Sequence, residues 1–151
     1  MPSSWEYIVH GDAEAAVVDI LLNDTPELPH FPPNPPLHIT TNMISYDPLE
    51  RWIVVTQEGS LRTWPKIDRP RIDVEVLAER RSVTHDIASI ALASIERAMG
   101  AYQGFGLTIT DVKLEQGITR VPDKLQETSR YIFSVRLTTV PFGAALVVPF
   151  S

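Results

Sequence analysis

The sequence contains no cysteine, and its first 50 residues contain no lysine or arginine. Without cysteine, the chain cannot form a disulfide, a thiolate zinc site or a cysteine nucleophile. No apolar run approaches the roughly 18–20 residues that a membrane-spanning helix needs, so we expect no membrane segment. Residues 1–6 have neither a basic nor an apolar signal region, and we therefore expect no export signal.

The missing bases divide the chain by charge. Residues 1–50 carry eight acids and no base, a net charge of −8, and residues 51–151 carry 13 bases against 19 − 8 = 11 acids, a net of +2. The total of −6 argues against tight binding to nucleic-acid phosphates, which needs clustered bases. Such a split suits head-to-tail contacts between identical subunits, in which an acidic face meets a basic one.

No repeat or internal boundary divides the sequence, and a chain of this length can bury about 70% of its unfolded surface in one core. Six of the 13 prolines fall in residues 26–36. Because proline lacks an N–H donor and fixes φ, this stretch predicts a stiff, extended connector. We therefore expect a single domain over residues 1–151, with this connector and an apolar C-terminal tail at residues 141–151.

Two segments have the periodicity of helices. Residues 12–24 place apolar positions at helical spacing after Asp12, which is a good N-cap. Residues 82–102 form the longer predicted helix, with Ser82 or Thr84 as its cap and two glycines near its end. The alanines of this second helix allow close approach to a sheet.

Strands are expected between the helices and after the second one. Residues 71–76 and 130–137 alternate between apolar and polar positions, as half-buried strands do. Residues 51–56 form a β-prone run, and residues 107–115 predict another strand before a polar loop at 116–128. The element order predicts an α+β fold, an antiparallel sheet with the long helix and the N-terminal helix packed on one face.

No group of residues has the spacing of a catalytic or metal site. His85 and Asp86 are adjacent, so on a helix they point in different directions. A metal centre needs three or four converging donors, and the sequence contains no HxH, HxxxH or HxxE. Gly104 to Gly106 leads into an expected strand, whereas phosphate-binding loops lead into a helix. We expect no catalytic residue, no metal and no cofactor, and we do not expect an enzyme.

Several features of the sequence are better explained by contacts with other protein subunits than by a catalytic or binding site. The densest basic cluster, Arg69, Arg71, Arg80 and Arg81, alternates with acids and predicts an ion-paired surface. The apolar tail predicts either a partner surface or an edge strand of the chain's own sheet. The residues that we expect at subunit or partner interfaces are Phe31, Trp64, Arg69, Arg71, Arg120, Asp123, Leu146, Val148 and Phe150.

In their order along the chain, these elements resemble the tail terminator proteins of long-tailed, non-contractile bacteriophages, particularly those of actinobacterial hosts. The resemblance covers roughly residues 12–140. It departs from the family at Gln57 to Ser60, where glycines would be expected. The matching segments are Asp12–Ala15, Trp52–Thr56, Asp68–Pro70, Ile72–Val76, the helix from Ser82, Ile109–Leu114, Val121–Asp123 and Arg130–Phe133.

The resemblance implies a structural virion protein without catalysis. Members of the family form a six-fold ring that caps the head-proximal end of the tail tube, ends its polymerisation and joins the tail to the head. The implied partners are further copies of the chain, the major tail tube protein and a head completion or connector protein. Genomic DNA would cross the lumen without specific binding. The implied location is the virion tail, after assembly in the cytoplasm of the bacterial host.

Two other functions remain open from the residues. The first is a neighbouring head-to-tail connector or head completion protein, which belongs to the same structural class. The second is a small enzyme or ligand-binding domain, with its site between the sheet and the proline-rich connector. This second alternative predicts a deep pocket with converging polar groups such as His38 or His85, and a shallow surface would count against it.

Overall fold

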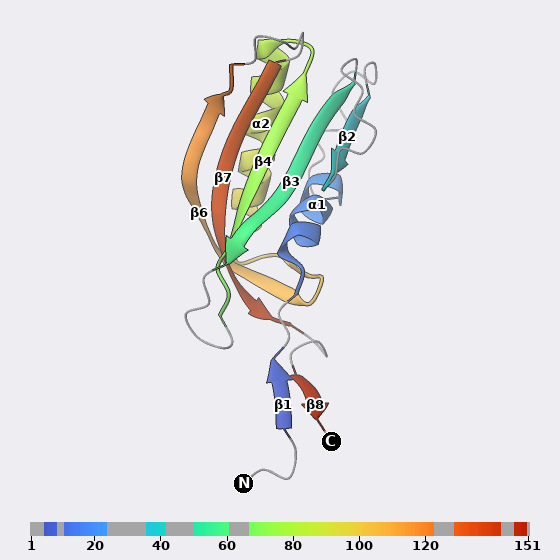
Figure 1. Ribbon diagram of the computed structural model, residues 1–151, viewed down its shortest axis with the longest axis vertical. Coiled ribbons are helices and arrows are strands. Elements are labelled where there is room, and N and C mark those ends of the chain that lie inside the picture. Colours follow the sequence, from blue (N-terminus) through green and yellow to red (C-terminus); the bar gives the residue numbers. More distant parts are fainter. Residues whose placement is uncertain are drawn as a thin grey trace.

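A mixed sheet of six strands, with two helices beside it, makes up the body of the computed structural model (Figure 1). The structure describes residues 5–8, 11–23, 36–41, 50–60, 67–122, 129–142 and 147–150, and the first and last of these segments by their backbone alone. The elements in these residues are β1 (Trp5–Ile8), α1 (Ala13–Asn23), β2 (Leu37–Thr40), β3 (Arg51–Ser60), β4 (Pro70–Ala78), α2 (Arg81–Arg97), β5 (Gln103–Gly104), β6 (Leu107–Arg120), β7 (Ser129–Pro141) and β8 (Val147–Phe150).

The strand order of the main sheet is β2-β3-β4-β7-β6-β5. The fold is α+β, but the expected purely antiparallel sheet is wrong, because β2 runs parallel to β3. Ten residues separate Thr40 from Arg51, more than a hairpin turn uses, so the chain can return to the end at which β2 began. The other strand pairs of this sheet are antiparallel.

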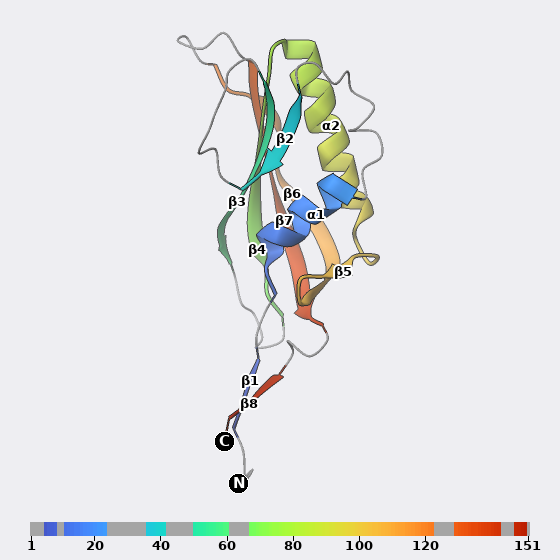
Figure 2. The same cartoon turned by 90° about the vertical axis from the view of Figure 1, so that its right-hand side faces the viewer.

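Both helices lie on the same side of the main sheet (Figure 2). Helix α2 connects β4 to β6, which run in the same direction on either side of β7, and it contacts all three strands. Helix α1 contacts β2, β3 and α2. The opposite face of the sheet, which we call the open face, carries the alternate side chains of β4, beginning with Arg71, Asp73 and Glu75.

The predicted start and end of the second helix are wrong. Its N-cap is Arg80, which makes no side-chain capping bond, and the Thr84 hydroxyl donates instead to the Arg80 carbonyl at 2.7 Å. The helix ends at Arg97 instead of residue 102, because Gly100, with φ of 73°, turns the chain toward β6. The predicted cap of α1 is confirmed, since Asp12 Oδ1 accepts a bond from the Ala15 amide at 3.0 Å.

The core lies between the helices and the sheet, as the alternation of the sequence predicts. Ile72, Val74 and Val76 of β4 have no exposed surface, and on β7 Phe133 and Val135 are equally buried. The helices contribute their apolar stripes to the same cluster: Ala16, Val17, Ile20 and Leu21 of α1, and Ile87, Ala88, Ala91 and Ile95 of α2. The sequence predicts this packing because the strand and helix periods place these residues on one face.

Strand β6 is longer than predicted. Residues 116–120, expected in a loop, pair with β7 as far as Arg120 opposite Tyr131. The register shifts three times between Ile109 and Thr119, so the polar stretch joins the sheet through bulges. Pro141, expected in the apolar tail, is instead the last residue of β7 and is buried.

The two ends of the chain pair with each other outside the main sheet. Strands β1 and β8 form a separate antiparallel sheet of two strands, which we call the terminal ribbon. It lies beyond the lower end of the main sheet in both views (Figure 2). The described part of the tail after Phe142, residues 147–150, therefore pairs with β1 and not with the main sheet.

A buried arginine ties the start of β3 to the segment between β4 and α2. The Arg51 side chain is 4% exposed and forms a two-pronged pair with Glu79, with Nη2 2.6 Å from Oε1 and Nε 3.0 Å from Oε2. The hydrogen bond from Arg51 holds the pKa of the Glu79 carboxyl below its ordinary value of 4.5. Removing this carboxylate charge would leave the buried guanidinium poorly compensated.

We expect Glu79→Gln to lower the free energy of unfolding by about 1–3 kcal/mol near neutral pH, because the amide keeps the size but loses the charge. Since the folded pKa is lowered, this stabilisation is present above pH 4.5 and disappears as the pH falls through the folded pKa. Urea denaturation at several pH values measures the difference. The matched control is Glu96→Gln on the exposed side of α2, and a deficit that persists at the lowest pH would contradict the assignment.

Candidate interaction surface

Segments from the beginning, middle and end of the chain meet where the main sheet adjoins the terminal ribbon. The Asp12 amide donates to the Phe105 carbonyl at 3.0 Å, and the Phe142 amide donates to the Gly106 carbonyl at 2.9 Å. Gly11 lies so close that an added Cβ would be 2.1 Å from the Phe105 oxygen. We call these five residues the ribbon root.

The open face of the sheet carries a lattice of paired charges. Arg71 Nε donates to Asp73 Oδ1 at 3.2 Å, and the Ser134 hydroxyl donates to the same oxygen at 2.5 Å. In the neighbouring row, Arg130 lies 2.7 Å from Glu75. These contacts join β4 to β7 across their shared edge, so the polar positions of both strands stabilise the sheet.

The basic charges of this face gather around one carboxylate on β6. Arg136 donates to Glu115, and its other nitrogen donates to the Arg69 carbonyl at 2.9 Å. The bond from Arg136, together with the charges of Arg71 and Lys113, holds the pKa of Glu115 below its ordinary value. Arg71, Lys113 and Arg136 outnumber the two carboxylates that they meet, Glu115 and Asp73, so this part of the face has a positive balance.

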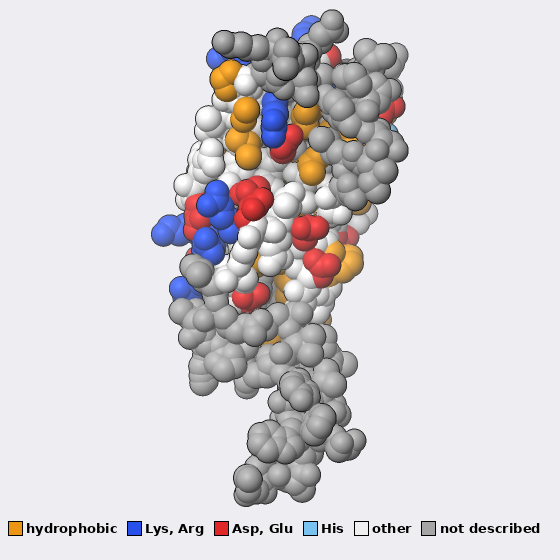
Figure 3. Space-filling model, viewed as in Figure 1, with side chains coloured by type: hydrophobic (Ala, Val, Ile, Leu, Met, Phe, Trp, Pro, Cys, Tyr) orange, Lys and Arg blue, Asp and Glu red, His pale blue; other side chains and the backbone are white. Residues whose placement is uncertain are grey.

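The two signs of charge occupy different parts of the open face. Figure 3 shows lysine and arginine gathered on the side of β6 and β7, with aspartate and glutamate across the middle and toward β3 and α1. On that acidic side, Glu14 of α1 accepts a bond from the Gln57 amide of β3 at 2.8 Å. Of the acids named on this surface, Glu14 belongs to residues 1–50, whereas Asp73, Glu75 and Glu115 belong to the second part of the chain, so this pattern differs from the charge division predicted from the sequence.

A depression at the start of α2 holds the other half of the predicted basic cluster. Its volume is about 590 Å³, and Arg81 Nε donates to the Tyr131 hydroxyl at 3.1 Å beside it. The predicted cluster is therefore divided, with Arg69 and Arg71 near the open face and the other two arginines here. The depression is lined by Arg80, Arg81, Ser82, His85, Asp86 and Tyr131.

A second hollow, less charged than the first, runs along the C-terminal half of α2. Two adjoining depressions, of about 360 and 200 Å³, share Ser94 and Arg97. The Tyr102 hydroxyl donates to Asp19 at 2.6 Å and so fixes the α1 side of the larger one. We call the pair the α2 groove, and its apolar walls come from Ile20, Ile90, Ala93, Ala98 and Ala101.

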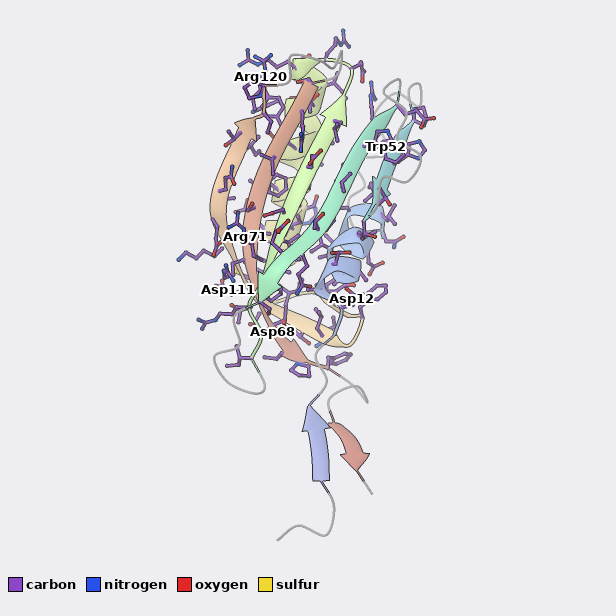
Figure 4. All side chains as sticks on the ribbon, in the orientation of Figure 1. Asp12, Trp52, Asp68, Arg71, Asp111 and Arg120 are labelled. Atoms are coloured by element: carbon purple, nitrogen blue, oxygen red, sulfur yellow. The ribbon has the colours of Figure 1, made fainter. Side chains whose placement is uncertain are left out.

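Of the nine predicted interface residues, Arg69, Arg71 and Arg120 have described side chains. Arg71 is near the lower end of the sheet and Arg120 near the upper end, so these residues do not form one patch (Figure 4). The others are not described in this way: Val148 and Phe150 are given by backbone alone, and those outside the described residues are Phe31, Trp64, Asp123 and Leu146.

The histidines proposed for a ligand site belong to separate contacts. The His38 ring stacks on Trp52 with centroids 4.5 Å apart, and its Nε2 lies 2.7 Å from Glu50. The His85 ring meets Tyr131 edge-on at 5.7 Å. Among the described residues, no three acidic or histidine side chains are grouped to hold a metal ion, and no described helix could span a membrane.

No protein-family model matches the chain, and no curated protein is significantly similar to it. The surface features described above therefore carry the functional argument. Two aromatic residues of the ribbon root, Phe105 and Phe142, are 54% and 43% exposed and were not predicted as interface residues. The sequence offered a weak signal for Phe105, a large apolar residue between two glycines where a polar turn would be expected.

We expect Gly11→Ala to destabilise the fold by about 1–3 kcal/mol, because its Cβ would collide with the backbone of the ribbon root. The matched control is Gly59→Ala on β3, where an added Cβ has no atom within 4 Å, and we expect a change within about 0.5 kcal/mol. Urea denaturation measures both variants. Equal stabilities for the two would show that the contact at Gly11 is not rigid.

Proposed function

We propose that this protein is a structural subunit that associates head-to-tail into a six-fold ring at the head-proximal end of a phage tail tube. The observation that carries this proposal is the terminal ribbon, which joins both ends of the chain outside the main sheet. We assign the ring to the phage tail because the order of helices and strands in the sequence resembles that of tail terminator proteins. Such a ring would end tube polymerisation and present a surface to the head.

The ribbon suits a role in association because of its size. A sheet of two strands is marginally stable in water by itself and needs packing against another surface. Within the described part of the chain each strand pairs only with the other, so its second edge can pair with a further strand. A neighbouring subunit can supply both the packing surface and the missing strand partner, so assembly would stabilise the ribbon.

The division of charge on the open face suits contact between copies. In a head-to-tail ring, different faces of identical subunits meet, so the basic side around Glu115 can approach an acidic side of the next copy. A two-fold interface whose axis passes between the two sides would also pair basic with acidic groups. The charge pattern therefore supports association between copies, and the cyclic ring comes from the resemblance to tail terminator proteins.

Passage of DNA without specific binding also agrees with the described charges. Arg71, Arg130 and Arg136 of the open face are paired with Asp73, Glu75 and Glu115, respectively. Paired guanidinium groups offer less attraction to phosphates than a free basic stripe would. We propose that the ring lets DNA slide, and that the partners are further copies, the tube protein and a head completion or connector protein.

The direct test is polymerisation of the major tail tube protein in the presence of this chain, followed by electron microscopy. We expect short tubes with a ring at one end, while tubes formed without the chain continue to grow. Tubes of unchanged length without a ring would refute the terminator role. A ring found on isolated heads but never on tubes would instead assign the chain to the neighbouring connector.

We expect deletion of residues 147–151, which removes β8, to prevent ring formation while the main sheet still unfolds cooperatively. The reason is that β8 pairs with β1 and with no strand of the main sheet. Light scattering measures assembly, and thermal denaturation measures folding. Removal of Ser151 alone is the control, and a truncated protein that assembles normally would show that the ribbon does not contribute.

A further inference from the structure

Phe105 has a backbone conformation that its side chain disfavours. It lies at φ of 50°, the left-handed region, and is the one described residue other than glycine with positive φ. Gly106 follows at φ of 78°, and the two residues connect β5 to β6. A two-residue hairpin turn with both φ values positive strongly prefers Asn-Gly, so phenylalanine replaces the residue that the turn would favour.

Burial does not account for the phenylalanine either. Phe105 is 54% exposed, and Phe142, whose amide bonds to the Gly106 carbonyl, is 43% exposed. A residue that strains the backbone and leaves half of its apolar surface in water benefits the isolated chain little. Such outliers are characteristic of positions where a partner contacts the side chain.

The turn is also held rigidly in place. The Asp12 amide binds the Phe105 carbonyl, and the close approach of Gly11 leaves no room for movement toward α1. An anchor that is already ordered loses little conformational entropy on binding. Aromatic anchors of this kind contribute disproportionately to protein interfaces when they enter an apolar pocket.

We propose that Phe105, with Phe142 beside it, is the anchor by which one copy of this chain docks onto the next. The inference rests on the proposed ring and names one of its contacts. Phe105 lies at the ribbon root, next to the terminal ribbon that itself needs a neighbour, so both would belong to a single continuous interface. The basic and acidic sides of the open face complement each other between copies, which favours a second copy of this chain as that neighbour.

The α2 groove is the acceptor on the second copy. Its walls combine Ile20, Ile90 and Ala98 with two charged residues, Asp19 and Arg97, whereas Arg80, Arg81, His85 and Asp86 line the depression at the start of α2. An aromatic ring can pack against the apolar walls and lie beside the Arg97 guanidinium. When Phe105 of one copy enters the groove of the next without a reciprocal contact, the contact is heterologous and can close into a ring.

The test is Phe105→Asn, which gives the turn its preferred residue and removes the anchor. We expect the melting temperature to stay constant or rise by up to about 4 °C, while the weight-average mass in sedimentation velocity falls from that of the ring to that of the monomer. Leu22→Asn on α1 is the control, since Leu22 is 54% exposed, as Phe105 is, and should assemble normally. Normal assembly of Phe105→Asn would overturn the anchor.

Mixing two variants tests the acceptor. Ala93→Arg places a charge in the groove at an exposed position, and we expect it to be monomeric alone, as Phe105→Asn is. Mixed together, one variant keeps an intact groove and the other an intact anchor, so they should form dimers and no rings. Failure of the mixture to dimerise would overturn the anchor–groove pairing.

The same measurements separate this contact from the proposed function. A wild-type chain that is monomeric at every concentration, alone and with tube protein, overturns both the ring and the contact. If the wild type forms rings that do not cap tubes, and Phe105→Asn is monomeric, the contact stands and the tail function fails. If Phe105→Asn forms rings that cap tubes, the function stands and the contact fails.

Discussion

The backbone lock at the ribbon root is the contact on which the arrangement of the protein depends. Two amide-to-carbonyl bonds there join the start of α1, the turn between β5 and β6, and the end of β7. Because Gly11 has no Cβ, the N-terminal segment approaches closely enough to make the first bond. The lock holds the start of α1 and the residue after β7 against the same turn, at the end of the main sheet beyond which the terminal ribbon lies (Figure 1).

Much of the fold follows from the sequence because the core obeys simple periods. The alternation around Val74 and Phe133 and the helical stripe of α1 predicted the buried residues correctly. The predictions of strand pairing and strand length fail where the local alternation of apolar and polar residues does not determine the structure. The parallel pairing of β2 with β3 joins segments that a ten-residue connection separates, which the local pattern cannot predict. The polar end of β6 pairs with β7 through bulges, and its residues have no alternating pattern that would predict a strand.

The residues predicted at interfaces stay predictions, since most of their side chains lie outside the described part of the structure. Among those described, Arg71 lies toward the lower end of the sheet and Arg120 at its upper end (Figure 4). Phe105 was missed because two flanking glycines indicate a turn, and a turn residue is expected to serve the backbone rather than a partner. Only the three-dimensional structure combines its positive φ, its exposure and the bonds that hold it.

The most direct measurement of the central claim is the mass of the assembled protein by native mass spectrometry. A ring of six copies of the 16.9 kDa chain would appear as one dominant species of six times that mass, decreasing as the salt concentration rises because opposite charges meet at the interface. A mass of one chain at every concentration, or a salt-independent dimer, would contradict the account.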